Sequence, residues 1–224
     1  MYTGDIMAIE RSEITTRLSA LATSTIANAL DRVDSIGRIM VNLKPVAPGM
    51  RFVGPAVTVR EESGPLGTFR SEDFKVGAMI DAASAGDVIV VAVDGVPYST
   101  WGGMASLAAA TKGVAGIAVD GGARDADETV DAGFNVFTRH LVPTTGRCRL
   151  NIAEIGGTVV VDGVTVSSGD WVVADDTGIL AIPAGIVERV IELSEAFTLE
   201  DEQAANAIRE GLSFSEAMKK FGNI

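Results

Sequence analysis

The sequence predicts an α/β domain in which a parallel sheet is followed by an antiparallel layer and a helical C-terminal arm. Two short, wholly apolar runs, Val88–Val93 and Val114–Val119, are typical of strands covered on both faces, and a helical segment separates them. The chain after Cys148 instead carries two hairpin signals, and residues 186–224 carry helical periodicity. Together these patterns favour one domain over residues 1–224, with 186–224 as the arm.

The N-terminal half predicts helices and strands in alternation. An amphipathic stripe predicts a helix over Ser12–Asp31, with Thr23–Thr25 as a place where one helix ends and another is capped. Gly49–Arg60 is strand-like but interrupted by Gly54-Pro55. Three elements follow before the second apolar run: a helix at Phe74–Ala83, the strand Val88–Val93 and a helix at Met104–Lys112.

The second half completes the parallel sheet and then changes character. The strand Val114–Val119 is expected to end at Asp120-Gly121-Gly122, and a helix at Ala126–Ala132 leads to a strand at Asn135–Thr138. This β-α-β-α-β order implies crossover helices. Turns at Asp162-Gly163 and Asp175–Thr177 predict two hairpins, Thr158–Val161 with Val164–Val166 and Trp171–Ala174 with Gly178–Ile182. Helices are predicted at Ile186–Phe197, Glu200–Glu210 and Ser213–Phe221.

Composition narrows the functional class. The formal net charge of −12 repels phosphate backbones, so we expect no nucleic-acid partner. A single cysteine, Cys148, excludes an intrachain disulfide and fits a reducing compartment. The N-terminus lacks the pattern of a signal peptide, and no apolar run is long enough to span a membrane. We therefore expect a cytoplasmic protein.

Two neighbouring motifs carry the predicted chemistry. Gly102 and Gly103 precede a helix whose first N–H groups have no intrahelical partner, which suits an anion, although a tight turn explains the glycines equally. Arg124 and Asp125 follow a buried strand, where ligands of α/β sheets bind. Arg124 can bind a carboxylate through two hydrogen bonds, and Asp125 can bind a hard divalent cation. The alternative without a function is that the two residues form a surface ion pair with each other.

Other polar residues have weaker claims. His140 is a candidate general base but is more typical of a surface or capping residue, and Cys148 lacks the partners of a nucleophile. Trp101 suits packing at the rim of the site. Asp175-Asp176 suits turn chemistry, whereas Asp94 and Asp120 end apolar strands and could lie near a cation.

Four segments resemble the regulator of ribonuclease activity A (RraA) family: Gly54–Arg60, Gly86–Val93, Trp101–Asp125 and Gly169–Pro183. The resemblance runs from about Thr23 to Gly211. It is closest to the enzymatic branch, the class II 4-hydroxy-4-methyl-2-oxoglutarate / 4-carboxy-4-hydroxy-2-oxoadipate aldolases, because the ribonuclease-regulating branch lacks the aspartate that this chain keeps at Asp125. The most specific feature is the Arg-Asp pair about twenty residues beyond the WGG turn.

The resemblance implies a β/β/α swivelling-domain fold in a homotrimer, or in a hexamer made of two trimers. It implies that Arg124 binds the pyruvate part of a 2-oxo acid and that Asp125 binds Mg²⁺ or Mn²⁺. The carboxylate would be held by backbone amides after the glycine turn, at Gly102, Gly103, Met104 and Ala105. Glu202 of a neighbouring subunit would support metal-bound water, with Glu200 and Asp201 as rivals.

The implied reaction cleaves a 4-hydroxy-2-oxo acid to pyruvate and a second oxo acid, and oxaloacetate decarboxylation is expected beside it. One departure from the aldolase pattern is Gly103, where those enzymes carry an acidic residue that orders metal-bound water. Two alternatives therefore stay open: a lyase or decarboxylase for a different 2-oxo acid, and a non-catalytic regulator that binds a ribonuclease or helicase.

Overall fold

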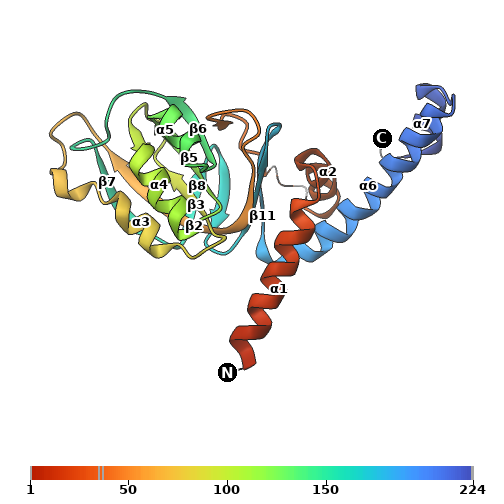
Figure 1. Cartoon of the computed structure of the whole chain (residues 1–224), viewed down its shortest axis with the longest axis horizontal. Coiled ribbons are helices and arrows are strands. Elements are labelled where there is room, and N and C mark those ends of the chain that lie inside the picture. The colour runs from red at the N-terminus through yellow and green to blue at the C-terminus, as the bar shows by residue number, and fades with distance from the viewer. Residues whose placement is uncertain (1, 35, 37, 223–224) are drawn as a thin grey trace. The chain divides into compact units, whose positions relative to one another are not determined.

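The computed structural model describes residues 2–34, 36 and 38–222 of the chain (Figure 1). It divides into two compact units, one formed by Met1–Ile36 with Gly185–Ile224 and the other by Gly37–Ala184. N-terminal helices thus share a unit with the predicted C-terminal arm. Within the described residues, no helix is both long and apolar enough to cross a membrane.

The first unit is helical. It contains α1 (Tyr2–Ser19), α2 (Thr23–Val33), α6 (Val187–Arg209) and α7 (Phe214–Lys220). The Arg17 guanidinium donates two hydrogen bonds of 2.8 Å to the Glu195 carboxylate, which ties α1 to α6. The two helices predicted at Ile186–Phe197 and Glu200–Glu210 are one continuous helix, because the residues between them include no glycine or proline and Thr198 bonds back to the Ser194 carbonyl.

The second unit is built on a nine-stranded mixed sheet with the strand order β1-β6-β5-β3-β2-β10-β11, in which β4 also pairs with β5 and β7 with β2. The strands are β1 (Lys44–Pro45), β2 (Phe52–Ser63), β3 (Val88–Ala92), β4 (Ser99–Trp101), β5 (Gly116–Ala123), β6 (Val136–Leu141), β7 (Leu150–Ile155), β10 (Trp171–Asp175) and β11 (Gly178–Ile182). A separate antiparallel hairpin joins β8 (Thr158–Val161) to β9 (Val164–Ser167). The predicted α/β fold with parallel and antiparallel strands is confirmed.

The core explains why the central strands are wholly apolar. Alternate residues of β3 face two different clusters: Val88 and Val90 pack with the β8–β9 hairpin and β10–β11, whereas Ile89 and Val91 pack with the helices. Those helices are α3 (Val76–Ala82) and α4 (Gly103–Lys112), which with α5 (Ala126–Asp131) lie together in Figure 1. A strand buried on both faces has no polar face, as predicted.

Three strand predictions need correction. β2 is continuous through Gly54-Pro55, because Pro55 stands opposite Trp171 where the β10 ladder ends and the β3 ladder begins only at Ala56. β5 runs on through Asp120-Gly121-Gly122, because the unpredicted strand β4 pairs with its last turn-like residues. β6 likewise extends to Leu141 and includes His140.

Candidate active site

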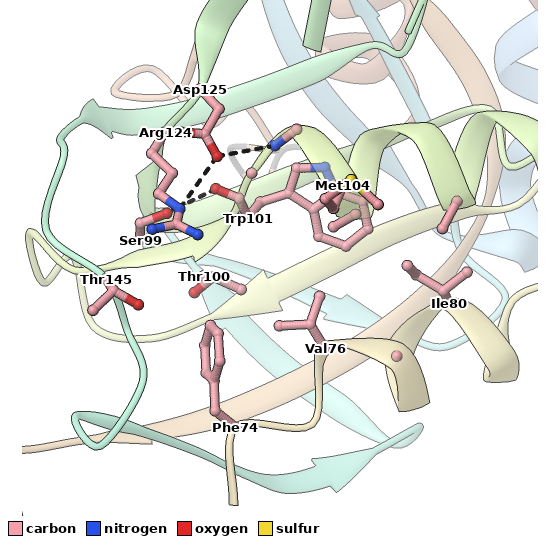
Figure 2. A pocket seen from close by; sticks show the side chains of 15 residues that line it. Phe74, Val76, Ile80, Ser99, Thr100, Trp101, Met104, Arg124, Asp125 and Thr145 are labelled. Carbon is pink, nitrogen blue, oxygen red and sulfur yellow. Dashed lines mark hydrogen bonds and ion pairs between the residues drawn. The ribbon is translucent and has the colours of Figure 1, made fainter. Parts of the chain in front are cut away.

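A pocket of about 330 Å³ lies where β4 and β5 end, and Figure 2 shows it from close by. Four parts of the chain meet there: the segment from β4 into α4, the residues after β5, a segment from Phe74 into the helix Val76–Ala82, and Thr145 between β6 and β7. The lining residues are Phe74, Val76, Gly77, Ile80, Ser99, Thr100, Trp101, Gly102, Gly103, Met104, Ala105, Ala108, Arg124, Asp125 and Thr145. All predicted site residues except Glu202 are among them.

Parallel pairing brings the two predicted motifs together. Ser99 of β4 stands opposite Gly122 of β5, and Trp101 stands opposite Ala123. The Arg124 N–H then donates to the Trp101 carbonyl at 3.0 Å, which extends the pairing by one residue. Because parallel strands end at the same edge of the sheet, the Gly-Gly turn and the Arg-Asp pair emerge side by side.

Asp125 holds an unusual conformation that directs its carboxylate into the site. Its φ of 55° is left-handed, a region that aspartate tolerates better than most residues. Although Asp125 is the N-cap of α5, its side chain does not cap that helix. Instead, Oδ2 accepts a hydrogen bond of 3.3 Å from the Gly103 N–H and lies 3.3 Å from Arg124 Nε. The carboxylate therefore faces the other helix, α4, and the pocket.

The N-terminus of α4 supplies hydrogen-bond donors to the pocket. Gly102 is the N-cap and has no side chain to cap the helix, and Asp125 Oδ2 accepts a hydrogen bond from the Gly103 N–H only. The N–H groups of Met104 and Ala105 belong to the first turn, where no intrahelical carbonyl is available, and both residues line the pocket. A β-carbon at Gly102 would lie 2.7 Å from Asp125 Oδ2, so glycine is needed for the close approach of the two segments. This end of the pocket is suited to an anionic group.

Glu128 occupies the space beside Gly103. A β-carbon at Gly103 would lie 1.9 Å from Glu128 Oε2 and 2.6 Å from Glu128 Cβ. The sequence showed only that position 103 lacks the acidic side chain of the aldolase pattern. A carboxylate lies there, but it arrives from α5 instead of from position 103.

Buried hydroxyl contacts fix the position of α4 against α5. Trp101, only 1% exposed, donates from Nε1 to Ser106 Oγ at 3.0 Å. Ser106 Oγ also contacts the Gly102 carbonyl and Thr129 Oγ1, each at 3.1 Å. Trp101 is thus a packing residue that lines the pocket, and it holds the helix that carries Gly103 and Met104.

Glu61 lies behind the pocket wall and was not singled out by its sequence. It is 4% exposed, and its Oε2 accepts a hydrogen bond of 2.5 Å from Oγ1 of the pocket residue Thr100. Its Oε1 is buried without a hydrogen-bond partner among the described residues. Burial raises the pKa of Glu61 to about 7, and the Thr100 hydrogen bond offsets this only in part. A charged residue at an apolar position of β2 was the available signal.

The Asp125 carboxylate of the pocket and the Glu128 carboxylate beside Gly103 suit a cation that keeps much of its water. Within the described residues, no group of three or more His, Cys, Asp or Glu side chains could hold a metal ion. Mg²⁺ commonly binds through one or two carboxylates and several waters, and Asp125 with Glu128 beside Gly103 matches that donor set.

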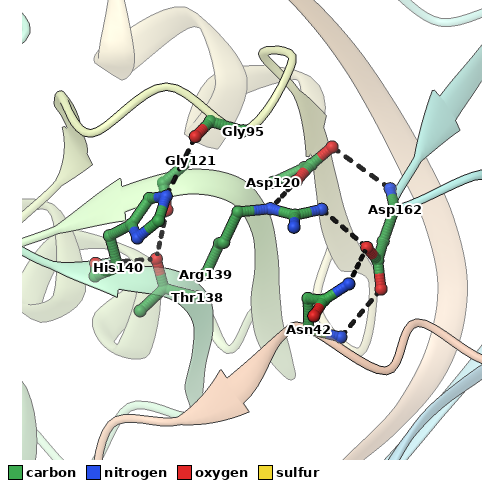
Figure 3. Close-up of polar contacts among 8 residues, drawn as sticks. All are labelled: Asn42, Gly95, Asp120, Gly121, Thr138, Arg139, His140 and Asp162. Carbon is green, nitrogen blue, oxygen red and sulfur yellow. Dashed lines mark hydrogen bonds and ion pairs between the residues drawn. The ribbon is translucent and has the colours of Figure 1, made fainter.

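Two of the remaining candidates, Asp120 and His140, form contacts away from the pocket (Figure 3). Asp120 Oδ1 accepts a hydrogen bond of 2.6 Å from Arg139 Nε, and Oδ2 accepts one of 3.1 Å from the Asp162 N–H. Arg139 also donates to Asp162 Oδ1 at 2.6 Å, so this group anchors the β8–β9 turn. His140 Nε2 lies 2.9 Å from the Gly95 carbonyl. Neither Asp120, His140 nor Asp94 lines the pocket.

Three further predictions concern residues outside the pocket. Asp175 makes the expected turn contact, accepting a hydrogen bond of 2.8 Å from the Thr177 N–H. Asp176 instead accepts one of 2.7 Å from the N–H of Gly49, in a distant segment of the chain. Cys148 is half-buried in the loop before β7. Glu202 is exposed on α6 of the helical unit, and its role, which requires a second copy of the chain, stays a prediction.

Comparisons with known proteins find related sequences. A family model described as RraA-like, Aldolase/RraA, matches residues 23–181. Protein DlpA of Legionella pneumophila is 27% identical over 201 residues, which are 88% of this chain but 32% of DlpA. A Halalkalibacterium halodurans protein with the provisional name 4-hydroxy-4-methyl-2-oxoglutarate aldolase is 29% identical over 198 residues, 88% of this chain and 89% of its own.

One solved structure extends the likeness to the fold. It is that of RraAS2 of Streptomyces coelicolor, described as an unusual member of the RNase ES inhibitor RraA protein family. It matches with a TM-score of 0.75 and 26% identity, and covers 87% of this chain and 96% of RraAS2.

The buried carboxyl group of Glu61 predicts a pH-dependent stability. Its pKa in the folded state, about 7, is above the ordinary value of 4.5, so between these values the unfolded state releases a proton that the folded state keeps. The free energy of unfolding should therefore fall as pH rises from about 4.5 to 7, by on the order of 2–3 kcal/mol. Glu61→Gln cannot ionise and should remove this fall.

Urea unfolding of both proteins between pH 5 and 8 measures the difference. Glu62→Gln, a change at the exposed neighbouring residue, is the matched control and should keep the wild-type profile. Parallel profiles for wild type and Glu61→Gln would show that Glu61 ionises as easily in the folded protein as in the unfolded chain.

Proposed function

Since the chain belongs to the RraA-like (Aldolase/RraA) family, we propose that it is a divalent-metal-dependent carbon–carbon lyase. It cleaves a 4-hydroxy-2-oxo acid to pyruvate and a second oxo acid, with oxaloacetate decarboxylation as a side activity. The observation that carries the proposal is the meeting of Arg124, Asp125 and the α4 N-terminus in one pocket. A positive group, a metal-binding carboxylate and free N–H donors are what a 2-oxo acid requires.

The residues in and beside the pocket have different proposed roles. Arg124 and the N–H groups of Met104 and Ala105 bind the carboxylate and keto end of the substrate, and Asp125 with Glu128 would hold Mg²⁺ or Mn²⁺. The cation, when bound, acts as a Lewis acid on the keto oxygen. The C4 hydroxyl loses its proton to a base, the C3–C4 bond breaks, and its electron pair stays on the pyruvate fragment. Arg124 stabilises the negative charge that develops on that fragment.

A non-catalytic regulator of a ribonuclease is the second candidate, and the similarity to RraAS2 favours it. A simple assay of pyruvate release distinguishes the two functions. A lyase releases pyruvate from 4-hydroxy-2-oxo acids or oxaloacetate, as followed with coupled lactate dehydrogenase, and stops when the metal is chelated. Failure to release pyruvate from any member of a broad panel, with either Mg²⁺ or Mn²⁺, would leave the regulator as the better proposal.

Asp125→Asn should abolish metal-dependent turnover and weaken Mn²⁺ binding at least about tenfold, because an amide oxygen is a poorer ligand for a hard cation than a carboxylate. Asparagine tolerates the left-handed backbone at this position, so the fold should survive. Electron paramagnetic resonance of free Mn²⁺ measures binding, and circular dichroism checks the fold. Asp127→Asn on the same helix is exposed, lies outside the pocket and should change neither property. Retained Mn²⁺ affinity in Asp125→Asn would place the metal elsewhere.

Arg124→Lys keeps the charge but loses the planar pair of donors that matches a carboxylate. We expect kcat/KM to fall on the order of 10- to 100-fold while the affinity for Mn²⁺ stays near wild type. Arg70→Lys, at an exposed arginine outside the pocket, controls for the general effect of the exchange. Unchanged steady-state kinetics for Arg124→Lys would remove this residue from the mechanism.

Gly103 and Glu128 should behave as a pair. Glu128→Gly alone should lose proton transfer assistance, which is typically worth roughly 10²- to 10⁴-fold in rate. Gly103→Asp alone should also impair the enzyme, because the new β-carbon collides with Glu128 Cβ, which the α5 backbone holds in place. Gly103→Asp combined with Glu128→Gly removes that β-carbon and restores a carboxylate, so it should recover part of the activity.

The measurement is kcat for the fastest-cleaved substrate in all four proteins, with Tm as the check on folding. A Gly103→Asp variant that is more active than wild type would mean that Glu128 moves aside freely and supplies nothing. A double variant no better than Glu128→Gly would show that the two positions are not interchangeable.

A further inference from the structure

The two ends of the pocket differ in chemistry. Figure 2 shows Arg124 and Asp125 on one side of the pocket and Phe74, Val76 and Ile80 on the opposite side. The apolar side is completed by α4, which contributes Ala108. A small acid whose carboxylate is bound at the polar end therefore extends its far end towards hydrocarbon side chains.

The distribution of charge makes this division selective. Among the residues that line the pocket, all of which the structure describes, Arg124 is the only cation, and Asp125 is the only anion. A substrate with two carboxylates would pair one of them with Arg124 and leave the other near Phe74, Val76 and Ile80. The hydroxyl groups of Ser99 and Thr100 in the lining already donate to the Trp101 carbonyl and to Glu61, which leaves the Thr145 hydroxyl as the side-chain donor of that wall. A carboxylate that loses water and gains no cation and at most one neutral hydroxyl is disfavoured. An alkyl group in the same place gains free energy from leaving water.

Resting on the proposed lyase function, we propose that the pocket selects monocarboxylic 4-hydroxy-2-oxo acids that carry an apolar substituent at C4. The C4 hydroxyl proton leaves to the base, the C3–C4 bond breaks, and C3 takes up a proton to complete pyruvate. C4 becomes the carbonyl carbon of an apolar aldehyde or ketone. The volume of about 330 Å³ is at the lower end of the range for small-molecule sites, which suits a short alkyl chain.

Binding separates this selectivity from the lyase function itself. Pyruvate, 2-oxohexanoate and 2-oxoglutarate share the 2-oxo acid end and differ only in the group that reaches the apolar side. Calorimetric titrations with Mg²⁺ present should show 2-oxohexanoate binding on the order of tenfold tighter than pyruvate, because its additional methylene groups are buried. 2-Oxoglutarate should bind more weakly than pyruvate.

A positive charge placed on the apolar side of the pocket should reverse the order of affinities for 2-oxohexanoate and 2-oxoglutarate. Ala108→Lys adds a cation to the pocket wall, and we expect 2-oxoglutarate to bind that variant more tightly than 2-oxohexanoate. Leu107→Lys is the matched control, since it makes the same addition one residue away on α4, at a half-exposed side chain that does not line the pocket. Leu107→Lys should keep the wild-type order, which separates a local effect from the change in net charge.

The outcomes are distinct. Wild-type protein that binds 2-oxoglutarate more tightly than 2-oxohexanoate overturns the proposed selectivity, and leaves the lyase function standing if pyruvate binds with Mg²⁺. Equal shifts in Ala108→Lys and Leu107→Lys overturn it as well, because the selectivity would then not arise at the pocket wall. Absence of binding by all three acids overturns both the selectivity and the proposed function.

Discussion

The parallel pairing of β4 with β5 is the constraint on which the candidate site depends. It sets Trp101 opposite Ala123, so the chain leaves both strands at one edge of the sheet. The Gly102-Gly103 turn and the Arg124-Asp125 pair then need only their local conformations to meet. The left-handed backbone of Asp125 completes the arrangement, because it turns the carboxylate away from its own helix and towards the first N–H of α4. Such a conformation costs on the order of 1 kcal/mol and persists where the surroundings fix it.

The wall of the pocket is held by buried hydrogen bonds, and behind it lies a buried carboxyl group that destabilises the fold when ionised. Trp101, Ser106 and Thr129 form a buried chain of hydrogen bonds that fixes α4 against α5. Glu61 lies behind the same wall with one carboxyl oxygen unsatisfied among the described residues, and the free energy of folding is less favourable when it is ionised. A carboxyl group kept in such a place, next to the pocket residue Thr100, is more typical of a functional region than of a plain core.

Different residues of the same pocket have the proposed roles in the reaction and in substrate selectivity. Under the proposed function, Arg124 binds the anionic end of the substrate and Asp125 binds the cation. The hydrocarbon side chains on the opposite side, Phe74, Val76 and Ile80, determine which substituent of the substrate fits. The regulator alternative draws on overall likeness to RraAS2 and not on the pocket, so the polar end of the pocket is what distinguishes the two functions.

The sequence by itself determined the local features of this protein. Wholly apolar runs identified the buried strands β3 and β5, and the turns at Asp162-Gly163 and Asp175–Thr177 identified the β8–β9 and β10–β11 hairpins. The position of Arg124-Asp125 after a buried strand pointed to two residues that line the pocket. Each of these signals lies within a few neighbouring residues. Periodicity and turn chemistry act at that range, so they can be read without knowing the fold.

Only the tertiary structure decided which distant segments meet. β4 and β7 have no strong pattern of their own and form because β5 and β2 offer them an unpaired edge. Phe74 and Ile80 reach the pocket because α3 packs beside α4 in the core, and Glu128 covers Gly103 because α5 follows the Arg-Asp pair. The burial of Glu61 depends on the same packing. Contacts between residues far apart in the chain leave no periodic trace, and the shape of the whole domain selects them.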